Sequence, residues 1–362
     1  MEKPVTGEVM AMKTFLPITF IAGMLLATAG GRARQEEPVK VFDAGAGANA
    51  PGWHEQSIPV ADTQRWYRYY LPTNAAASPA VVVLLHGGTM SMRKQFERRV
   101  GGAHAWIEIA DKEGFILLVP NGTNPETGDT RGDEQNWNDL RAEGSGRHAR
   151  NDDVKFIRDL LDWTIATLHA NPRRVYVTGA SNGGMMTYRM VIDASDRIAA
   201  AAAFIATLPA DLPGMKQPAR PVPLMIVNGT DDPIMKWGGG HIPAGGPDQS
   251  STPDTVAWWI KADHATTNGV TTEALPDTDP KDHCRVYRTL YPPESGGAPV
   301  LFYKIEGGGH AMPSREHQFR EGPIIQKAFG LPRDVEGADL AWTFMKGFTS
   351  PQPGEDDPSL NP

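Results

Sequence analysis

Short apolar segments recur along the chain between segments of helical pattern, and this alternation constrains the fold more than any other feature. Each segment is apolar at consecutive positions and bounded by Gly, Pro or Asn, which is typical of strands buried on both faces. These predicted strands cover residues 80–85, 115–120, 174–178, 223–227 and 300–305, with an aromatic-rich strand at 65–71. Apolar residues at three- and four-residue spacing predict helices at 105–113, 152–169, 182–192, 255–262 and 338–348. We therefore predict an α/β fold with a mostly parallel central sheet, helices on both faces and a single domain.

The two ends of the sequence differ from this pattern. From Met12 a lysine, an apolar run and small residues follow one another, which is the order of a secretory signal peptide. We expect a signal peptide over residues 1–33, with Met12 as the start, although a short N-terminal anchor is the alternative. Residues 34–52 predict a linker, 53–348 the folded domain, and the polar, Pro-rich residues 349–362 a disordered tail. A secreted or periplasmic protein that leaves the membrane after signal cleavage is expected.

Charge and cysteine content narrow the classes of partner and cofactor. The formal net charge is −8 over 362 residues with no basic stripe, which argues against nucleic acid as a partner. Cys284 is the only cysteine, so the sequence excludes an intramolecular disulfide and a cysteine-based metal site. No HExxH helix is present either. We expect no metal and no organic cofactor, and the sequence leaves the oligomeric state open.

A GxSxG motif carries the clearest chemical information. Ser181 stands in Gly179-Ala180-Ser181-Asn182-Gly183, directly after an apolar strand and directly before a helical segment. That strand–turn–helix context places a serine on a sharp turn at the carboxyl edge of a sheet, where it serves as a nucleophile. The alternative is a serine that only caps a helix, but a simple cap does not require glycine on both sides.

A serine nucleophile needs a base, and the base needs an orienting acid. In the α/β-hydrolase order the acid and then the histidine follow the serine along the chain. Asp231 and Asp232 are adjacent candidates after the strand at 223–227, and we favour Asp232. His310 follows the last predicted strand on a Gly-rich loop and is the candidate base. The weaker candidates are His241 and His317.

The oxyanion of the tetrahedral intermediate needs backbone N–H donors. Asn182, directly after the nucleophile, is one expected donor. The other is expected from Gly88, because an early strand leads directly into His86-Gly87-Gly88-Thr89. His86 comes too early in the chain to be the base, so we expect it to brace this loop. Trp137 and Trp237 lie in predicted loops, and stacking on substrate and ordinary packing are equally open for both.

With these residues in place, the chain resembles the secreted esterases that include polyhydroxybutyrate depolymerases and feruloyl esterases (carbohydrate esterase family one and relatives). The resemblance extends from about Tyr67 to Gly347. It is carried by the strings LLHGG, ADKEGFILLVPNG, WND, NDDVKFIRDLLD, RRVYVTGASNGGMM, VNGTDDPIMKWGGG and IEGGGHAMP. The resemblance implies the α/β-hydrolase fold, a Ser181–Asp232–His310 triad, and an oxyanion hole at Gly88 and Asn182.

The chain also departs from the family pattern at three places. Asn228 replaces a usual histidine, and Val270 stands where relatives often carry a cysteine, so the family disulfide is absent. Met312 stands where relatives often have a tryptophan after the catalytic histidine. It is therefore a third candidate substrate contact, with the aromatic wall missing.

These observations predict a secreted serine esterase that works through an acyl-enzyme, with an ester as its partner. The expected substrates are feruloyl or acetyl esters of plant polysaccharide, or hydroxyalkanoate oligomers. The alternatives are a polyhydroxybutyrate depolymerase proper, a peptidase on the same fold, and a non-catalytic binding protein.

Overall fold

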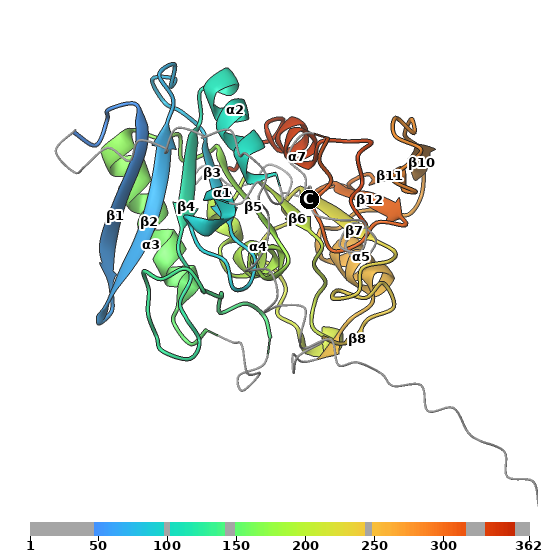
Figure 1. Cartoon of the computed structure of the whole chain (residues 1–362). Coiled ribbons are helices and arrows are strands. Elements are labelled where there is room, and N and C mark those ends of the chain that lie inside the picture. Colours follow the sequence, from blue (N-terminus) through green and yellow to red (C-terminus); the bar gives the residue numbers. More distant parts are fainter. Residues whose placement is uncertain (1–46, 98–101, 142–148, 243–247, 316–329, 352–362) are drawn as a thin grey trace, which may run out of the picture. The chain divides into compact units, whose positions relative to one another are not determined.

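The computed structural model describes residues 47–97, 102–141, 149–242, 248–315 and 330–351 (Figure 1). The chain divides into two units, Met1–Pro38 and Val39–Pro362, and every described residue belongs to the second. The predicted signal peptide, residues 34–46 of the predicted linker and residues 352–362 of the predicted tail therefore lie outside the described residues. Within the described ranges, no helix is long and apolar enough to cross a membrane.

A ten-stranded sheet forms the centre of the second unit, in the order β1-β2-β4-β3-β5-β6-β7-β12-β11-β10. Neighbours from β4 to β12 are parallel, whereas β1, β2, β11 and β10 pair antiparallel at the two sides. The mostly parallel sheet predicted from the sequence is thus confirmed. Its strands are β1 (Gly52–Val60), β2 (Thr63–Leu71), β3 (Val81–Leu85), β4 (Ile116–Pro120), β5 (Val175–Ala180), β6 (Ala200–Phe204), β7 (Leu224–Gly229), β10 (Thr271–Ala274), β11 (Arg285–Tyr291) and β12 (Val300–Glu306).

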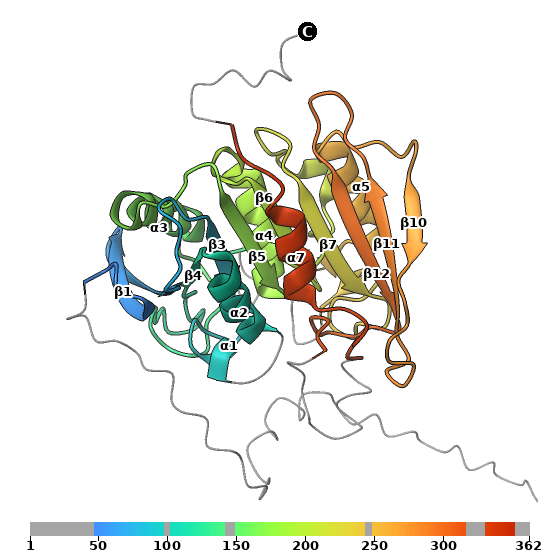
Figure 2. The ribbon, with the colours of Figure 1, turned by 90° about the horizontal axis from the view of Figure 1, so that it is seen from above.

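Helices cover both faces of this sheet, as Figures 1 and 2 show. One apolar layer packs under α3, α4 and α5, and the other packs under α1, α2 and α7. Consecutive residues of the central strands alternate between these layers: Val81 and Val83 belong to the first, and Val82 and Leu84 to the second. This is why those segments are apolar at every position. The helices are α1 (Lys94–Glu97), α2 (Ala103–Glu113), α3 (Asp153–Leu168), α4 (Asn182–Asp193), α5 (Thr252–Ala262) and α7 (Gly337–Met345), with short turns η2 (Ser195–Arg197) and η3 (Leu212–Gly214) and a small pair β8 (Gly240–His241) and β9 (Asp248–Gln249).

Several elements of the fold were not among the sequence predictions. β1 begins at Gly52, at the end of the predicted linker, and forms a hairpin with β2. β6 has the sequence AAAAF, and its alanines carry little strand preference of their own. Its position between β5 and β7 determines its conformation. Beyond α7, Ser350 is buried, and its backbone N–H donates to the Arg173 carbonyl at 2.9 Å. The chain is thus held at the beginning of the predicted tail.

Cys284 lies just before β11 with no exposed surface. Its backbone N–H donates to Asp282 Oδ1 at 2.7 Å. Burial and the neighbouring carboxylates raise the pKa of its thiol to about 12. The thiol is therefore protonated at neutral pH and behaves as an apolar side chain.

Candidate active site

Three side chains from different strands meet at the carboxyl edge of the parallel sheet. Ser181 directly follows β5, Asp232 follows β7, and His310 follows β12. His310 Nε2 lies 3.0 Å from Ser181 Oγ, and His310 Nδ1 lies 2.7 Å from Asp232 Oδ2. Although 129 residues separate Ser181 from His310 in sequence, the parallel strand order brings them together. The arrangement has the geometry of a nucleophile, a base and an orienting acid.

Ser181 occupies a strained turn between β5 and α4. Its backbone has φ 58° and ψ −122°, a conformation that non-glycine residues seldom adopt. The flanking glycines make the turn possible. A Cβ on Gly179 would lie 2.5 Å from the Gly183 carbonyl oxygen, and a Cβ on Gly183 would lie 2.2 Å from that of Leu85. The two glycines of the GxSxG motif therefore serve close backbone packing beside β3.

The two adjacent aspartates have different environments. Asp232 is buried, and its Oδ1 accepts hydrogen bonds from the backbone N–H groups of Ile234 and Met235, both at 2.8 Å. Its other oxygen is left to face His310. Asp231 is exposed, and its Oδ1 accepts from the Thr230 hydroxyl instead. The geometry thus separates the two candidates that the residues alone left open, and places Asp232 beside the imidazole.

The loop that carries His310 is tied to the loop that carries Asp232. Gly307 N–H donates to Thr230 Oγ1 at 3.0 Å, and Asp231 N–H donates to the Gly308 carbonyl at 2.9 Å. The His310 side chain is 10% exposed, whereas that of His241 is 63% exposed and faces Asp248. The remaining candidate base, at position 317, lies outside the described residues. Of the candidate bases that the structure describes, only His310 contacts Ser181.

The two predicted oxyanion segments lie side by side. Asn182 is the first residue of α4, where a backbone N–H has no acceptor within the helix. A methyl group in place of a Gly88 hydrogen would lie 3.5 Å from Asn182 Cβ. The neighbouring Thr89 N–H already donates to Asn136 Oδ1 at 2.8 Å. Among these backbone groups, Gly88 and Asn182 therefore remain the candidate donors.

His86 braces the Gly88 segment, as its position after β3 suggests. Its ring is buried; Nδ1 lies 2.8 Å from the Gly87 carbonyl oxygen, and Nε2 accepts the Gly122 N–H at 3.0 Å. Burial lowers the pKa of His86 to about 4, so the ring is neutral and carries its proton on Nδ1. Because a trans peptide is planar, fixing the Gly87 carbonyl also fixes the direction of the Gly88 N–H.

The three candidate substrate contacts lie in different environments. Trp137 has no exposed surface, and its Nε1–H donates to the His86 carbonyl at 2.8 Å, which favours packing over stacking on substrate. Met312 is 8% exposed and packs in the apolar layer beside α7. Trp237 is half-buried, 6.1 Å from the Phe302 ring and beneath Lys304. Among the described residues, none of these three side chains therefore forms a hydrogen bond or a ring contact with Ser181, Asp232 or His310.

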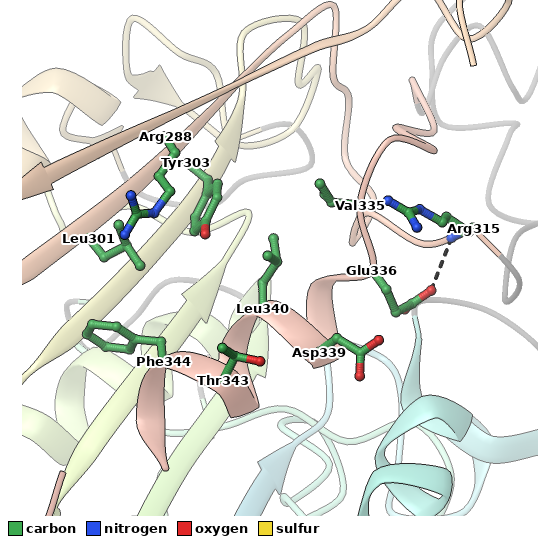
Figure 3. A pocket seen from close by; sticks show the side chains of 10 residues that line it. All are labelled: Arg288, Leu301, Tyr303, Arg315, Val335, Glu336, Asp339, Leu340, Thr343 and Phe344. Carbon is green, nitrogen blue, oxygen red and sulfur yellow. Dashed lines mark hydrogen bonds between the residues drawn. The ribbon is translucent and has the colours of Figure 1, made fainter. Parts of the chain in front are cut away.

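A separate pocket lies between α7 and strands β11 and β12, with a volume of about 440 Å³ (Figure 3). Its wall contains neither a triad residue nor a residue of the oxyanion segments. Two arginines and two carboxylates share its rim, so its charge favours no single class of ligand. The lining residues are Arg288, Leu301, Tyr303, Arg315, Val335, Glu336, Asp339, Leu340, Thr343 and Phe344.

Two polar residues at the site were missed by the sequence reasoning. Asn136 contacts the Thr89 backbone, and Asp139 accepts a hydrogen bond from the Asn182 side chain. Both belong to the buried segment around the Trp-Asn-Asp string, where polar residues flank a fully buried tryptophan. No sequence pattern marks these two residues; they are identified by their burial in the structure, because buried polar groups need partners.

Comparison with known proteins adds relatives that are named esterases, although no family model matches the sequence. The chain is 28% identical over 310 residues to "Putative esterase NocK" of Nocardia uniformis subsp. tsuyamanensis, covering 81% of this chain and 82% of that protein. It is 31% identical over 186 residues to Feruloyl esterase B of Piromyces equi, covering 50% and 32% respectively. It is also 31% identical over 156 residues to Acetylxylan esterase A of Emericella nidulans, covering 42% and 47%. The matched region thus spans most of the first relative but less than half of the other two.

Among solved structures, the Acetyl xylan esterase from Aspergillus awamori aligns with a TM-score of 0.48 and 18% identity, over 71% of this chain and 93% of that one. The fold assignment rests instead on the strand order and the helices on both faces. Sequence similarity to named esterases and this architecture agree. The chain is a carboxylic ester hydrolase with the α/β-hydrolase architecture, and parts of its sequence are similar to acetylxylan and feruloyl esterases.

Proposed function

We propose that the chain is a secreted serine esterase that hydrolyses acyl esters of plant polysaccharide, with Ser181 as nucleophile, His310 as base and Asp232 as orienting acid. The observation that carries the proposal is the continuous contact of these side chains, at 3.0 Å and 2.7 Å. Secretion is supported by the charged, apolar and small-residue order that follows Met12.

The geometry supports a two-step acyl transfer. Asp232 accepts a hydrogen bond from the Nδ1–H of His310, which leaves the unprotonated Nε2 free to take the proton of Ser181 Oγ as the oxygen attacks the ester carbonyl. The N–H groups of Gly88 and Asn182 stabilise the oxyanion that forms. His310 then gives its proton to the leaving alcohol as the ester C–O bond breaks. A water molecule attacks the acyl-enzyme with the same base and releases the carboxylic acid and free Ser181.

Acetyl esters are the substrate class that we propose first. Acetylxylan esterase A of Emericella nidulans and Feruloyl esterase B of Piromyces equi are both 31% identical to this chain over the matched residues, so sequence identity does not separate the two acyl groups. The complete burial of Trp137 supports the smaller acyl group, because this indole has no face available to stack on a feruloyl ring.

The test compares initial rates on 4-nitrophenyl acetate, acetylated xylan and methyl ferulate, with Ser181→Ala as control. We expect the acetyl esters to react faster than methyl ferulate. Ser181→Ala should lose at least about 10⁴-fold in kcat and all labelling by a fluorophosphonate probe. Retention of most activity in Ser181→Ala would refute the nucleophile assignment. Faster turnover of methyl ferulate than of acetylated xylan would refute the acyl-group preference.

A further inference from the structure

One four-residue segment contacts both of the backbone stretches that carry the candidate oxyanion donors. This segment, Asn136–Asp139, has the sequence Asn-Trp-Asn-Asp, and we name it the NWND segment. It lies in the irregular region between β4 and α3. One end contacts the loop after β3, and the other end contacts the first residue of α4. These two stretches are more than 90 residues apart in sequence.

The first contact fixes the backbone after Gly88. Asn136 Oδ1 accepts the Thr89 N–H at 2.8 Å, and Asn136 is 3% exposed. Thr89 has φ 58°, a left-handed conformation that is unfavourable for a β-branched residue. A bond to a buried side chain is one of the contacts that hold it there. Asn136 is itself fixed, because its N–H and carbonyl both pair with Thr123, at 3.0 Å and 2.9 Å.

The second contact fixes the side chain of the residue after the nucleophile. Asn182 Oδ1 accepts the Trp137 N–H at 2.8 Å, and its Nδ2 donates to Asp139 Oδ2. Arg141 pairs with the same carboxylate at 2.9 Å, which compensates the buried charge. Asn182 is 3% exposed and Asp139 1%. Both polar ends of the Asn182 amide are therefore satisfied, and its side chain has one available orientation.

The NWND segment is anchored independently of these two contacts. Asn138 N–H donates to Asp153 Oδ2 at 2.7 Å, and Asp153 forms a fully buried pair with Arg65 at 2.5 Å. Arg189 Nη1 donates to the Asn138 carbonyl at 2.6 Å. The indole of Trp137 donates to the His86 carbonyl, just before the Gly88 loop. The segment is thus held by α3 and α4 as well as by the sheet edge.

We propose that Asn136 and the Asn182 side chain, through the NWND segment, are positioning residues that hold the two oxyanion donors at a fixed separation. Neither side chain touches the substrate; each acts through a backbone N–H group. Oxyanion donors contribute fully only when they are preorganised about 3 Å from the developing charge. The inference rests on the proposed function, because it assumes that Gly88 and Asn182 donate to an oxyanion.

The test uses three matched substitutions, Asn136→Ala, Asn182→Ala and Asn228→Ala. All three asparagines are 3% exposed, so each change removes an equally buried amide. Asn228 bonds the Ala206 backbone and Thr252 Oγ1, away from the oxyanion segments, and is the control for lost stability. Asn136→Ser also shortens the side chain out of reach of Thr89, but it leaves a smaller cavity than Asn136→Ala. It replaces Asn136→Ala in the test if that variant does not fold.

The measurements are kcat and KM on 4-nitrophenyl acetate, and the inhibition constant of butylboronic acid, whose tetrahedral serine adduct occupies the oxyanion hole. The wild type and all variants are measured at one temperature, at least about 15 °C below the lowest Tm among them, so that every protein is folded. For the Asn136 and Asn182 variants we expect kcat to fall about 10- to 100-fold, with KM within about threefold of wild type. The boronic acid should bind weaker by a similar factor. Asn228→Ala should lose stability but keep kcat within about threefold.

Loss of kcat in the Asn136 and Asn182 variants no larger than in Asn228→Ala would overturn the inference. So would an unchanged inhibition constant for the boronic acid. Ser181→Ala, assayed in parallel, separates this failure from failure of the proposed function. If Ser181→Ala is inactive while the asparagine variants match the control, only the positioning role is wrong. If Ser181→Ala is as active as wild type, the proposed function fails and the positioning role fails with it.

Discussion

The surroundings of Asp232 determine what its amide replacement will do. Oδ1 accepts the N–H groups of Ile234 and Met235, both at 2.8 Å, and Oδ2 faces His310 Nδ1 at 2.7 Å. In Asp232→Asn the amide oxygen stays at the Oδ1 position, because an NH₂ there would face two donors. The NH₂ then donates to His310 Nδ1. The imidazole proton is left on Nε2, facing Ser181 Oγ, and the ring is unable to accept the serine proton.

This change of tautomer sets the size of the expected effect. The wrong tautomer at a triad histidine costs about 10⁴-fold in kcat, which corresponds to about 5.5 kcal/mol of transition-state stabilisation. The fold should be retained, because the two backbone bonds to Oδ1 remain. We therefore expect the Tm of Asp232→Asn to stay within about 3 °C of wild type. The assay is kcat on 4-nitrophenyl acetate, with the Tm from circular dichroism.

Asp231→Asn is the matched control, because it makes the same chemical change at the neighbouring position. Asp231 is exposed, and among the described residues its side chain bonds Thr230 alone, so kcat should stay within about twofold of wild type. A loss of less than about tenfold in Asp232→Asn at an unchanged Tm would contradict the tautomer argument. Equal losses in both variants would contradict the assignment of the acid.

Two further predictions concern the residues beneath the site. Burial lowers the pKa of His86 to about 4, so as the pH falls His86 becomes protonated in the unfolded chain before it does so in the folded chain. Above pH 6.5 His86 should not affect the free energy of unfolding, which should then decrease by about 3 kcal/mol as the pH falls to 4. Urea unfolding at pH 7 and pH 4.5 measures this decrease. It should be smaller in His86→Gln than in the wild type, and an equal decrease would refute the prediction. In Gly183→Ala the new Cβ would lie 2.2 Å from the Leu85 carbonyl oxygen, whereas Gly238→Ala meets nothing within 4 Å. By calorimetry, the Tm of Gly183→Ala should be about 5 to 10 °C lower than that of the wild type, and the Tm of Gly238→Ala should be unchanged. Equal Tm values for the two variants would show that the turn between β5 and α4 is not tightly packed.

The parallel core of the fold could be predicted because its strands are apolar on both faces. β3, with five valines and leucines, is recognisable by itself. β6 is not, because alanines suit a helix better than a strand, and only the space between β5 and β7 makes AAAAF extended. β1 was missed because its sequence, GWHEQSIPV, is mostly polar and has no apolar alternation, and it is stabilised mainly by pairing with β2.

The candidate site was predictable where chain order carries the information. Ser181, the Asp231–Asp232 pair and His310 each follow a recognisable strand, and parallel strands bring their carboxyl ends to one edge. The environment of Trp137 was not predictable, because it depends on the Asn182 amide and the His86 carbonyl, both distant in sequence. No periodicity marks such a contact. Buried polar networks are specified by three-dimensional proximity, so their members emerge only with the fold.

Because Cys284 is buried, its chemical modification reports the unfolding events that expose it. A thiol with no exposed surface and a pKa of about 12 offers almost no thiolate to an alkylating reagent while the fold is intact. Because no second cysteine exists, every modified molecule records an opening that reached the region before β11. The labelling rate under native conditions therefore counts these openings directly, without an engineered probe. The same burial leaves Ser181, the proposed nucleophile, without competition from a cysteine thiolate when the folded protein is treated with electrophilic probes.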